Sequence, residues 1–211
     1  MDVDAVEIRV LGCLIEKQRT TPDAYPLSLN SLRLACNQAT NRDPVVAYEE
    51  REIKAALDRM SNRSWTRFAS GVSSRALKYR QLLDEALGLS EPEISLLGVL
   101  MLRGPQTVGE LKQRSERLHR FGSIAEVGEV LDGLTQRELV SPLERRPGQK
   151  EERWQQLLGG DAEPATADEP VAAPAPGEAA DRLGAIEERL ERLEGAFDEL
   201  IARLDKVPDR E

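Results

Sequence analysis

The segment Leu11-Gly12-Cys13-Leu14-Ile15 returns as Leu97-Gly98-Val99-Leu100-Met101, 86 residues later in the chain. A second set of positions repeats in the same order at an offset of 74: Ile53, Ala56, Leu57, Met60, Arg63 and Trp65 correspond to Val127, Val130, Leu131, Leu134, Arg137 and Leu139. The two offsets differ by 12, so the first copy holds about a dozen extra residues between its matching segments. Two matches in the same order predict an internal repeat.

The first copy has the pattern of three helices followed by a hairpin. A first helix is predicted by apolar residues at helical spacing that form one stripe, Val3, Val6, Val10 and Leu14. A second helix is expected over about residues 29–37, with Ser28 as its N-cap. The repeated positions after residue 50 predict the third helix. Residues 64–68 alternate in polarity and residues 76–80 return after a glycine, which is typical of a hairpin.

The second copy marks its helix starts with capping boxes, in which a Ser or Thr and a Glu three residues later bond each other's backbone N–H groups. The three pairs are Ser90 with Glu93, Thr107 with Glu110, and Ser123 with Glu126. Residues 140–143 and 153–157 supply a hairpin after them. We therefore predict a mainly α fold with small β-hairpins (α+β), in two tandem winged helix-turn-helix domains at residues 1–88 and 89–158.

The C-terminal part of the chain has a different composition. Residues 159–181 are rich in Pro and Ala and lack large apolar side chains, which predicts a disordered linker. Residues 182–207 then carry an unbroken apolar heptad pattern that includes Leu183, Ile186, Leu190, Leu193, Phe197, Leu200 and Leu204. A coiled-coil helix that forms a homo-oligomer is the favoured interpretation, and an amphipathic helix folded back on the body is the alternative.

The net charge of −9 at pH 7 is concentrated at the C-terminal end. Residues 1–88 carry 13 basic and 12 acidic side chains, and residues 89–160 carry 10 and 11, whereas residues 161–211 carry 6 and 15. The two copies are therefore close to neutral, and the acidic total does not exclude a nucleic-acid partner.

The start of the chain and its cysteines favour a cytoplasmic protein with no membrane segment. Residues 1–4 are acidic, where a secretory signal would begin with basic residues. The longest uncharged apolar run, residues 94–102, is too short to span a bilayer. Cys13 and Cys36 lie in apolar helical patterns, so we expect two buried reduced thiols rather than a disulfide or a redox pair.

The segment at residues 20–30, Thr-Thr-Pro-Asp-Ala-Tyr-Pro-Leu-Ser-Leu-Asn, is more particular than a general helix-turn-helix pattern. It is joined by Ala35-Cys36-Asn37-Gln38, Asn41-Arg42-Asp43-Pro44, Leu102-Arg103-Gly104-Pro105-Gln106-Thr107 and Arg146-Pro147-Gly148-Gln149. With these blocks, residues 4–158 resemble the bacterial YceH family, whose function is unknown. The resemblance implies a tandem winged-helix fold in a cytoplasmic protein and implies no catalytic residue. A histidine is expected shortly after Lys78-Tyr79, where this chain has Arg80-Gln81.

The residues that common catalytic and metal sites need are scarce. His119 is the only histidine, and the chain has two cysteines. Zinc ligand sets and Cys/His dyads are therefore not expected. The Gly-x-x-x-x-Gly-Lys-Ser/Thr phosphate loop is absent. We expect a non-catalytic protein without a metal ion or other cofactor.

Candidate residues for binding double-stranded DNA gather in the first copy. Its hairpin region is basic without any acidic residue, and contains Arg59, Arg63, Arg67, Arg75, Lys78 and Arg80. Trp65, Phe68 and Tyr79 lie between these cations, a composition typical of a wing that follows phosphates. The extra segment adds side chains that read base edges well, Asn37, Gln38, Asn41 and Arg42. For these four, bonding to loop carbonyls is the favoured alternative.

The third helices are poorly suited to contact base edges of DNA, because their expected exposed residues are largely acidic. The helix of the second copy exposes Glu126, Glu129 and Asp132 and no cation. A winged helix places this element in the major groove, where carboxylates are repelled by phosphates. We therefore hold two hypotheses: a regulator-like protein that binds DNA through its first wing, and a protein-interaction scaffold that binds no nucleic acid. In both, the second domain packs against the first or faces a protein partner.

Overall fold

The computed structural model describes residues 3–69, 77–144 and 151–159. The first copy contains α1 (Ala5–Thr20), a 3-10 turn η1 (Pro22–Ala24), β1 (Leu27–Ser28), α2 (Leu29–Cys36), α3 (Glu50–Asn62), β2 (Thr66–Ala69) and β3 (Lys78–Gln81). A short helix, α4 (Leu83–Leu87), leads to the second copy, which contains α5 (Glu91–Arg103), β4 (Gln106–Thr107), α6 (Val108–Ser115), α7 (Ile124–Gln136), β5 (Val140–Leu143) and β6 (Arg153–Gln156). The predicted α+β class is confirmed. The predicted linker and coiled coil lie outside the described residues.

Each copy closes on a small antiparallel sheet, and the two sheets have equivalent strand orders, β1-β3-β2 and β4-β6-β5. The hairpins β2–β3 and β5–β6 lie where the alternating segments predict them. The two-residue strands β1 and β4 were not predicted. They pair Leu27 with Tyr79 and Gln106 with Trp154, so each hairpin is tied to the chain just before the second helix of its copy.

The predicted N-caps are confirmed, with one difference. Ser28 accepts a hydrogen bond from the backbone N–H of Ser31 at 3.2 Å, and the boxes at Ser90 and Thr107 are complete. At Ser123 only one half forms, because the Glu126 carboxylate accepts from the backbone N–H of Gly122 at 2.7 Å. The complete box predicted at Ser123 is therefore wrong: the glutamate reaches one residue further back.

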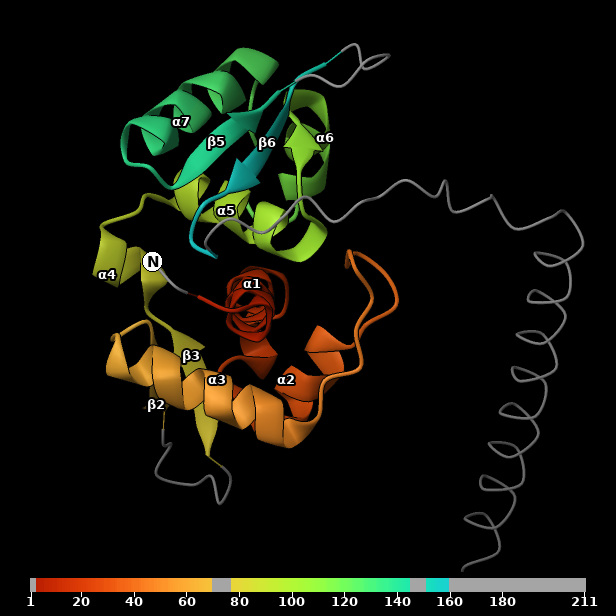
Figure 1. Cartoon of the computed structure of the whole chain (residues 1–211), viewed down its shortest axis with the longest axis vertical. Coiled ribbons are helices and arrows are strands. Elements are labelled where there is room, and N and C mark those ends of the chain that lie inside the picture. Colours follow the sequence, from red (N-terminus) through yellow and green to blue (C-terminus); the bar gives the residue numbers. More distant parts are fainter. Residues whose placement is uncertain (1–2, 70–76, 145–150, 160–211) are drawn as a thin grey trace, which may run out of the picture. The chain divides into compact units, whose positions relative to one another are not determined.

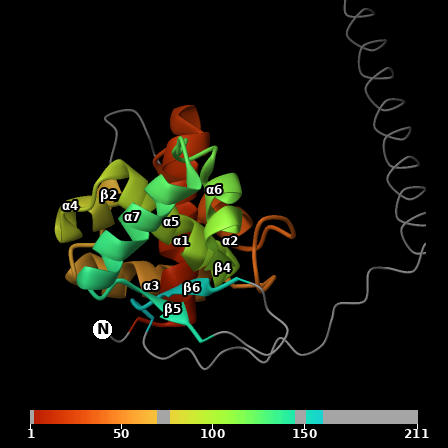
Figure 2. The ribbon, with the colours of Figure 1, turned by 90° about the horizontal axis from the view of Figure 1, so that it is seen from above.

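The predicted first helix is confirmed as α1, and Val3, Val10 and Leu14 of its predicted apolar stripe are buried, but the burial of α1 extends well beyond that stripe. Every residue from Glu7 to Ile15 is buried. The reason is that α5 packs on the side of α1 that the first copy leaves uncovered (Figures 1 and 2). The described residues all belong to one compact unit. The two copies thus share one core in place of two separate ones.

The repeated glycines lie where α1 and α5 approach each other. A Cβ on Gly12 would come within 2.9 Å of the Leu102 side chain and 3.0 Å of Met101 Cβ, and a Cβ on Gly98 would come within 2.9 Å of Ile15 Cγ2. Met101 and Ile15 occupy equivalent places in the two repeated segments. The repeat found in the sequence is therefore the contact surface between the copies, because only a residue without a side chain leaves room for the facing helix.

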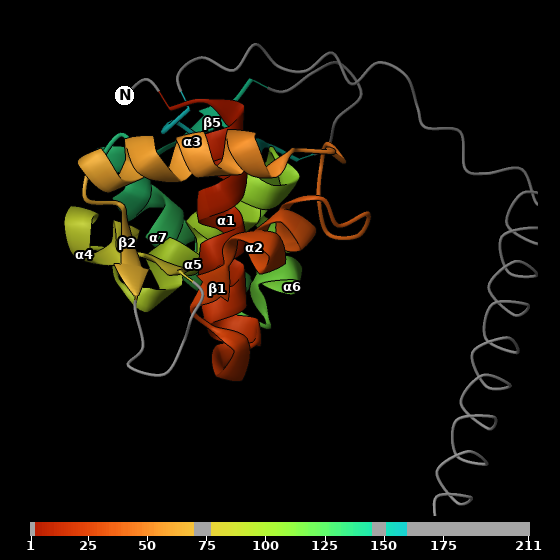
Figure 3. The same ribbon diagram turned by 90° about the horizontal axis from the view of Figure 1, so that it is seen from below.

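The α1–α5 pair separates the two third helices. Helices α3 and α7 lie on opposite sides of that pair, and each is accompanied by the hairpin of its own copy (Figure 1). Figure 3 is the view from the side on which α3 lies. The two equivalent helices therefore cannot contact one flat surface together. None of the helices described is long and apolar enough to cross a membrane.

Candidate nucleic-acid interface

The first hairpin sorts its side chains onto two faces. Arg67 lies directly opposite Arg80, and Ala69 lies opposite Lys78. Because side chains alternate along a strand, these positions share one face, and Tyr79, only 3% exposed, points to the other and into the core. Arg67, Lys78 and Arg80 form the solvent side of the sheet, which we call the basic face.

The aromatic residues of the hairpin region do not contribute equally. Trp65 and Tyr79 are buried core residues, whereas the Phe68 side chain is 43% exposed. The Phe68 ring lies 5.1 Å from that of Tyr79, and the Lys54 ammonium lies 5.9 Å from its centroid. Of the three aromatic residues expected between the cations, only Phe68 is exposed, and it lies on the Tyr79 side of the sheet rather than on the basic face.

The charges of the basic face are not fully compensated. Two like charges directly opposite each other across a strand pair are destabilising unless a counter-ion lies between them. Arg80 has such a partner, because its guanidinium lies 2.5 Å from the Glu85 carboxylate. Arg67 is exposed and has no ion pair within the part of the chain that the structure describes. An external anion near Arg67 would relieve the repulsion.

The second hairpin lacks this arrangement. At the positions equivalent to Arg67 and Arg80 it has Ser141 and Gln155, which are paired across the strands. The Gln155 amide donates to the Ser141 hydroxyl at 3.3 Å. Arg153 occupies the place of Lys78, and it donates to the Pro105 carbonyl at 3.1 Å and lies 3.8 Å from Glu110. The basic face is thus a property of the first copy alone.

Two further predicted cations are held by acidic residues near the start of α1. Arg59 pairs with Asp4 and lies 3.4 Å from Glu7, and Arg63 lies 3.3 Å from the same Glu7 carboxylate. Arg63 also lies over the Trp65 ring at 5.6 Å. These contacts fasten the end of α3 to α1 and reduce the positive charge offered to solvent. Arg75 lies outside the described residues.

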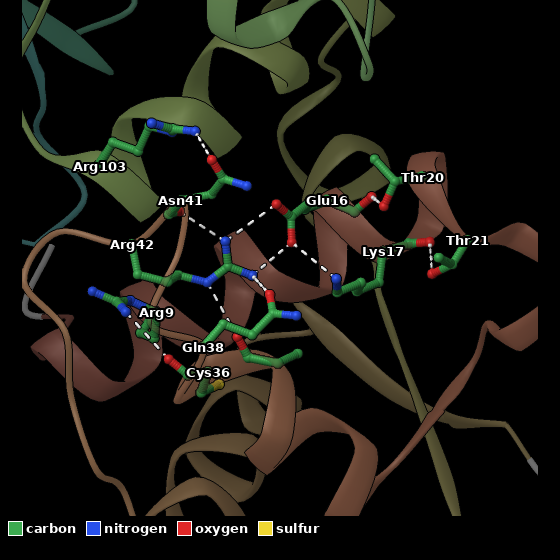
Figure 4. Close-up of polar contacts among 11 residues, drawn as sticks. Arg9, Glu16, Lys17, Thr20, Thr21, Cys36, Gln38, Asn41, Arg42 and Arg103 are labelled. Carbon is green, nitrogen blue, oxygen red and sulfur yellow. Dashed lines mark hydrogen bonds and ion pairs between the residues drawn. The ribbon is translucent and has the colours of Figure 1, made fainter. Parts of the chain in front are cut away.

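The extra segment of the first copy forms a loop at residues 37–49, which we call the insert loop. Asn37 bonds both backbone groups of Tyr48, at 2.9 Å each. Gln38 accepts from Arg42 at 2.8 Å, and Asn41 accepts from Arg103 of α5 (Figure 4). All four predicted side chains thus bond within the protein, which is the arrangement that the alternative interpretation expects.

Arg42 is the centre of this loop. It is buried, and its guanidinium meets the Glu16 carboxylate at 3.1 and 2.6 Å and the Ala35 carbonyl at 3.1 Å (Figure 4). Burial alone would raise the pKa of Glu16, but the hydrogen bonds and charge of Arg42 outweigh it and hold that pKa below its ordinary value. The pair is therefore fully ionised at neutral pH.

A second buried arginine, Arg9, was not identified from the sequence. It donates to the carbonyl of Cys36, the last residue of α2, at 3.2 Å and to that of Pro44 in the insert loop at 2.6 Å. Its place inside the apolar α1 segment is the one signal that could have marked it. Cys13 and Cys36 are both free and buried, as expected.

The exposed faces of the third helices carry the expected acidic residues. On α3 they include Glu50, Glu52 and Asp58, with the N-cap Glu49 and Arg51 also exposed. On α7 they include Glu129 and Asp132. Arg137, which caps α7, is bonded to Glu93 at 3.0 Å and to backbone carbonyls. Among the described residues, no three potential metal-binding side chains lie together.

Comparison with known proteins places this architecture in a family. A family model described as "Protein of unknown function, DUF480" matches residues 3–149. A protein of Geotalea uraniireducens named UPF0502 protein is 46% identical over 204 residues, covering 96% of this chain and 91% of the relative. Relatives with the same family name from Klebsiella pneumoniae and Geobacter sulfurreducens are 42% identical over 210 residues (96% of this chain, 94% of the relative) and 50% identical over 158 residues (74% and 72%). The predicted resemblance is confirmed: this chain belongs to the DUF480 family, the UPF0502 or YceH proteins.

Proposed function

We propose that the chain is a non-catalytic protein of two winged-helix modules that binds double-stranded DNA through the basic face of its first wing. The observation that carries this proposal is the cross-strand pair of Arg67 and Arg80, in which Glu85 pairs with Arg80 and Arg67 is left for an external anion. Lys78 extends the same face. A DNA-binding role places the protein in the cytoplasm, where bacterial DNA lies.

The contacts should be made to phosphates rather than to base edges. Helix α3 and its N-cap Glu49 together expose four carboxylates, which phosphates repel, and the polar side chains of the insert loop are occupied by bonds within the protein. Each cation that neutralises a phosphate releases counter-ions, so this mode needs no base contact. We therefore expect binding that is weakly dependent on sequence and strongly dependent on salt.

The second hairpin supplies a natural design for the test. The double variant Arg67→Ser and Arg80→Gln gives the first hairpin the pair found at Ser141 and Gln155. The side chains at all four positions are at least partly exposed, so the double variant should keep the fold. Fluorescence anisotropy with a labelled random duplex at low salt should show about tenfold weaker binding for this variant. This corresponds to the loss of about two phosphate contacts.

The matched control is Arg120→Gln, an exposed arginine outside both hairpins. It should bind the duplex about as tightly as the wild type. If the wild type does not bind at low salt, or if the control loses as much affinity as the double variant, the basic face is not a DNA-binding surface.

A protein-docking role for the second copy is a further candidate. On α7 the apolar Ile124 side chain is 59% exposed, and the acidic residues Glu129 and Asp132 are exposed on the same helix. A helix that exposes both an apolar residue and carboxylates is better suited to a basic protein surface than to DNA. Crosslinking from a residue placed at position 124 in cells should recover a defined protein, and recovery of nucleic acid alone would remove this candidate.

A further part of this proposal concerns the C-terminal segment and rests on its sequence pattern alone. We propose that residues 182–207 associate two or more copies, which would present several basic faces to one duplex. Deletion of residues 161–211 should reduce the mass in solution to that of the monomer. An unchanged mass would place the oligomer contact elsewhere or exclude it.

A further inference from the structure

A cleft of about 540 Å³ lies where the two copies meet. Its walls come from α1, α5, the insert loop, and α6 with the residues that follow it. Three arginines line it, Arg103, Arg114 and Arg117, against two glutamates, Glu16 and Glu116. The volume is that of ordinary small-molecule sites.

Among the residues that line the cleft, more arginines than glutamates lack an ion pair within the described part of the chain. Glu16 is occupied by the buried Arg42 (Figure 4), and Arg114 lies 3.3 Å from Glu110 on its own helix. Within the described ranges, neither Arg103 nor Arg117 has an ion pair. Glu116 is exposed to solvent. The cleft therefore has two cations available for an anion that enters it.

Arg103 is the better placed of the two. Its guanidinium donates to the side-chain oxygen of Asn41, which fixes its direction (Figure 4). Asn41 itself has a left-handed backbone, with φ of 59°, a conformation that asparagine adopts more readily than most residues. Burial lowers the pKa of Arg103, and the nearby Arg114 adds to that effect. A partly desolvated cation among like charges is stabilised by an anionic ligand.

We propose that the cleft binds a small phosphorylated metabolite, with its phosphate between Arg103 and Arg117. Guanidinium groups match the geometry of phosphate oxygens and bind them through paired N–H donors. The apolar wall, Val99, Leu102 and Leu118, lies beside these cations and can contact the carbon skeleton. Such a ligand would contact Asn41 of the first copy and Arg103 of the second, and would stabilise the junction.

The binding experiment uses the full chain in chloride buffer at constant ionic strength. Inorganic phosphate and ribose 5-phosphate are titrated by calorimetry and in thermal unfolding. The wild type should bind ribose 5-phosphate saturably and unfold several degrees higher at saturation. Arg103→Gln and Arg117→Gln should each weaken binding at least tenfold. Because Arg117 has no ion pair among the described residues, Arg117→Gln should still fold. It can therefore test the site even if Arg103→Gln unfolds.

Two controls separate this site from the basic face. Arg120→Gln and the hairpin double variant should bind ribose 5-phosphate like the wild type, whether or not either binds DNA. The cleft proposal is overturned by an absence of saturable binding or by equal binding in all variants. It is equally overturned if Arg103→Gln and Arg117→Gln lower affinity for duplex DNA alone, since the phosphate would then belong to the nucleic-acid backbone.

Discussion

The ion pair of Glu16 and Arg42 holds the insert loop against α1, and it sets a clear pH dependence. The Arg42 side chain is fully buried, so loss of its partner leaves a charge in the core. Glu16→Gln should lower the free energy of unfolding at pH 7 by on the order of 3 kcal/mol in urea titrations. The conservative amide keeps the size of the side chain, so the effect would report charge rather than packing.

The sign of the pH effect follows from the lowered pKa of Glu16. A carboxyl whose pKa lies below the ordinary 4.5 in the folded state contributes stability that is present above that value. This stability is lost as the pH falls through the lower, folded value. The difference between wild type and Glu16→Gln should therefore shrink below about pH 4. An equal difference at neutral and acidic pH would show that the charge is not the cause.

All three tyrosines should resist ionisation in the folded protein. Burial raises the pKa of Tyr25 to about 12, and it also raises the pKa of Tyr48 and Tyr79. Tyrosines in an unfolded chain ionise near pH 10. Spectrophotometric titration should show little tyrosinate at about pH 10 until the protein unfolds. Because the unfolded chain releases its protons first, stability should fall as the pH rises above that value. Half-ionisation of the native protein near pH 10 would contradict the burial.

At the scale of elements, the approach of α1 to α5 depends on its two glycines. Alanine normally stabilises a helix interior relative to glycine by about 1 kcal/mol. At Gly12 the added methyl group would meet Leu102 and Met101, and overpacking costs about 1–3 kcal/mol. Gly12→Ala and Gly98→Ala should therefore destabilise the protein by on the order of 1 kcal/mol in chemical unfolding.

Gly128 of α7 is the control for this substitution. A Cβ there would meet nothing within 4 Å, so Gly128→Ala should stabilise the protein through helix propensity alone. Stabilisation by Gly12→Ala of the same size as by Gly128→Ala would show that the helices do not pack as closely as described.

Local patterns predicted most of the elements, and long-range contacts account for what they missed. Ser28, Ser90 and Thr107 mark helix starts correctly, because capping involves residues only three apart. Strands β1 and β4 were missed, because two residues carry no alternation and pair with strands far along the chain. The burial of α1 and the role of Arg9 were missed for the same reason: each depends on a distant partner that no local spacing shows.

The candidate site likewise contains features that local patterns predict and long-range contacts that they do not. The cations of the first hairpin could be found from composition, and the alternation of a strand places Arg67, Lys78 and Arg80 on one face. The ion pairs of Arg59 and Arg63 with Glu7 could not be predicted, because the partner lies more than fifty residues earlier in the chain. The junction cleft was equally hidden, since it exists only where the two copies meet.

At the scale of the molecule, the shared core predicts that both copies unfold together. The chain has two tryptophans, Trp65 in the first copy and Trp154 in the second. Single-tryptophan variants, Trp65→Phe and Trp154→Phe, therefore report one copy each. Their fluorescence midpoints in urea, compared with circular dichroism of the same variant, should coincide for each protein. A fluorescence transition that is separate from the loss of helix would indicate copies that fold independently.

The most direct test of the DNA-binding account is the salt dependence of duplex affinity. The logarithm of the association constant is plotted against the logarithm of salt concentration for the wild type, Arg120→Gln and the Arg67→Ser, Arg80→Gln variant. Each phosphate contact contributes about −0.9 to the slope of this plot. The slope of the double variant should therefore be less steep than that of the wild type by up to about 1.8. The control should keep the wild-type slope. Equal slopes for all three proteins, or no duplex binding by the wild type at low salt, would contradict a phosphate-binding first wing.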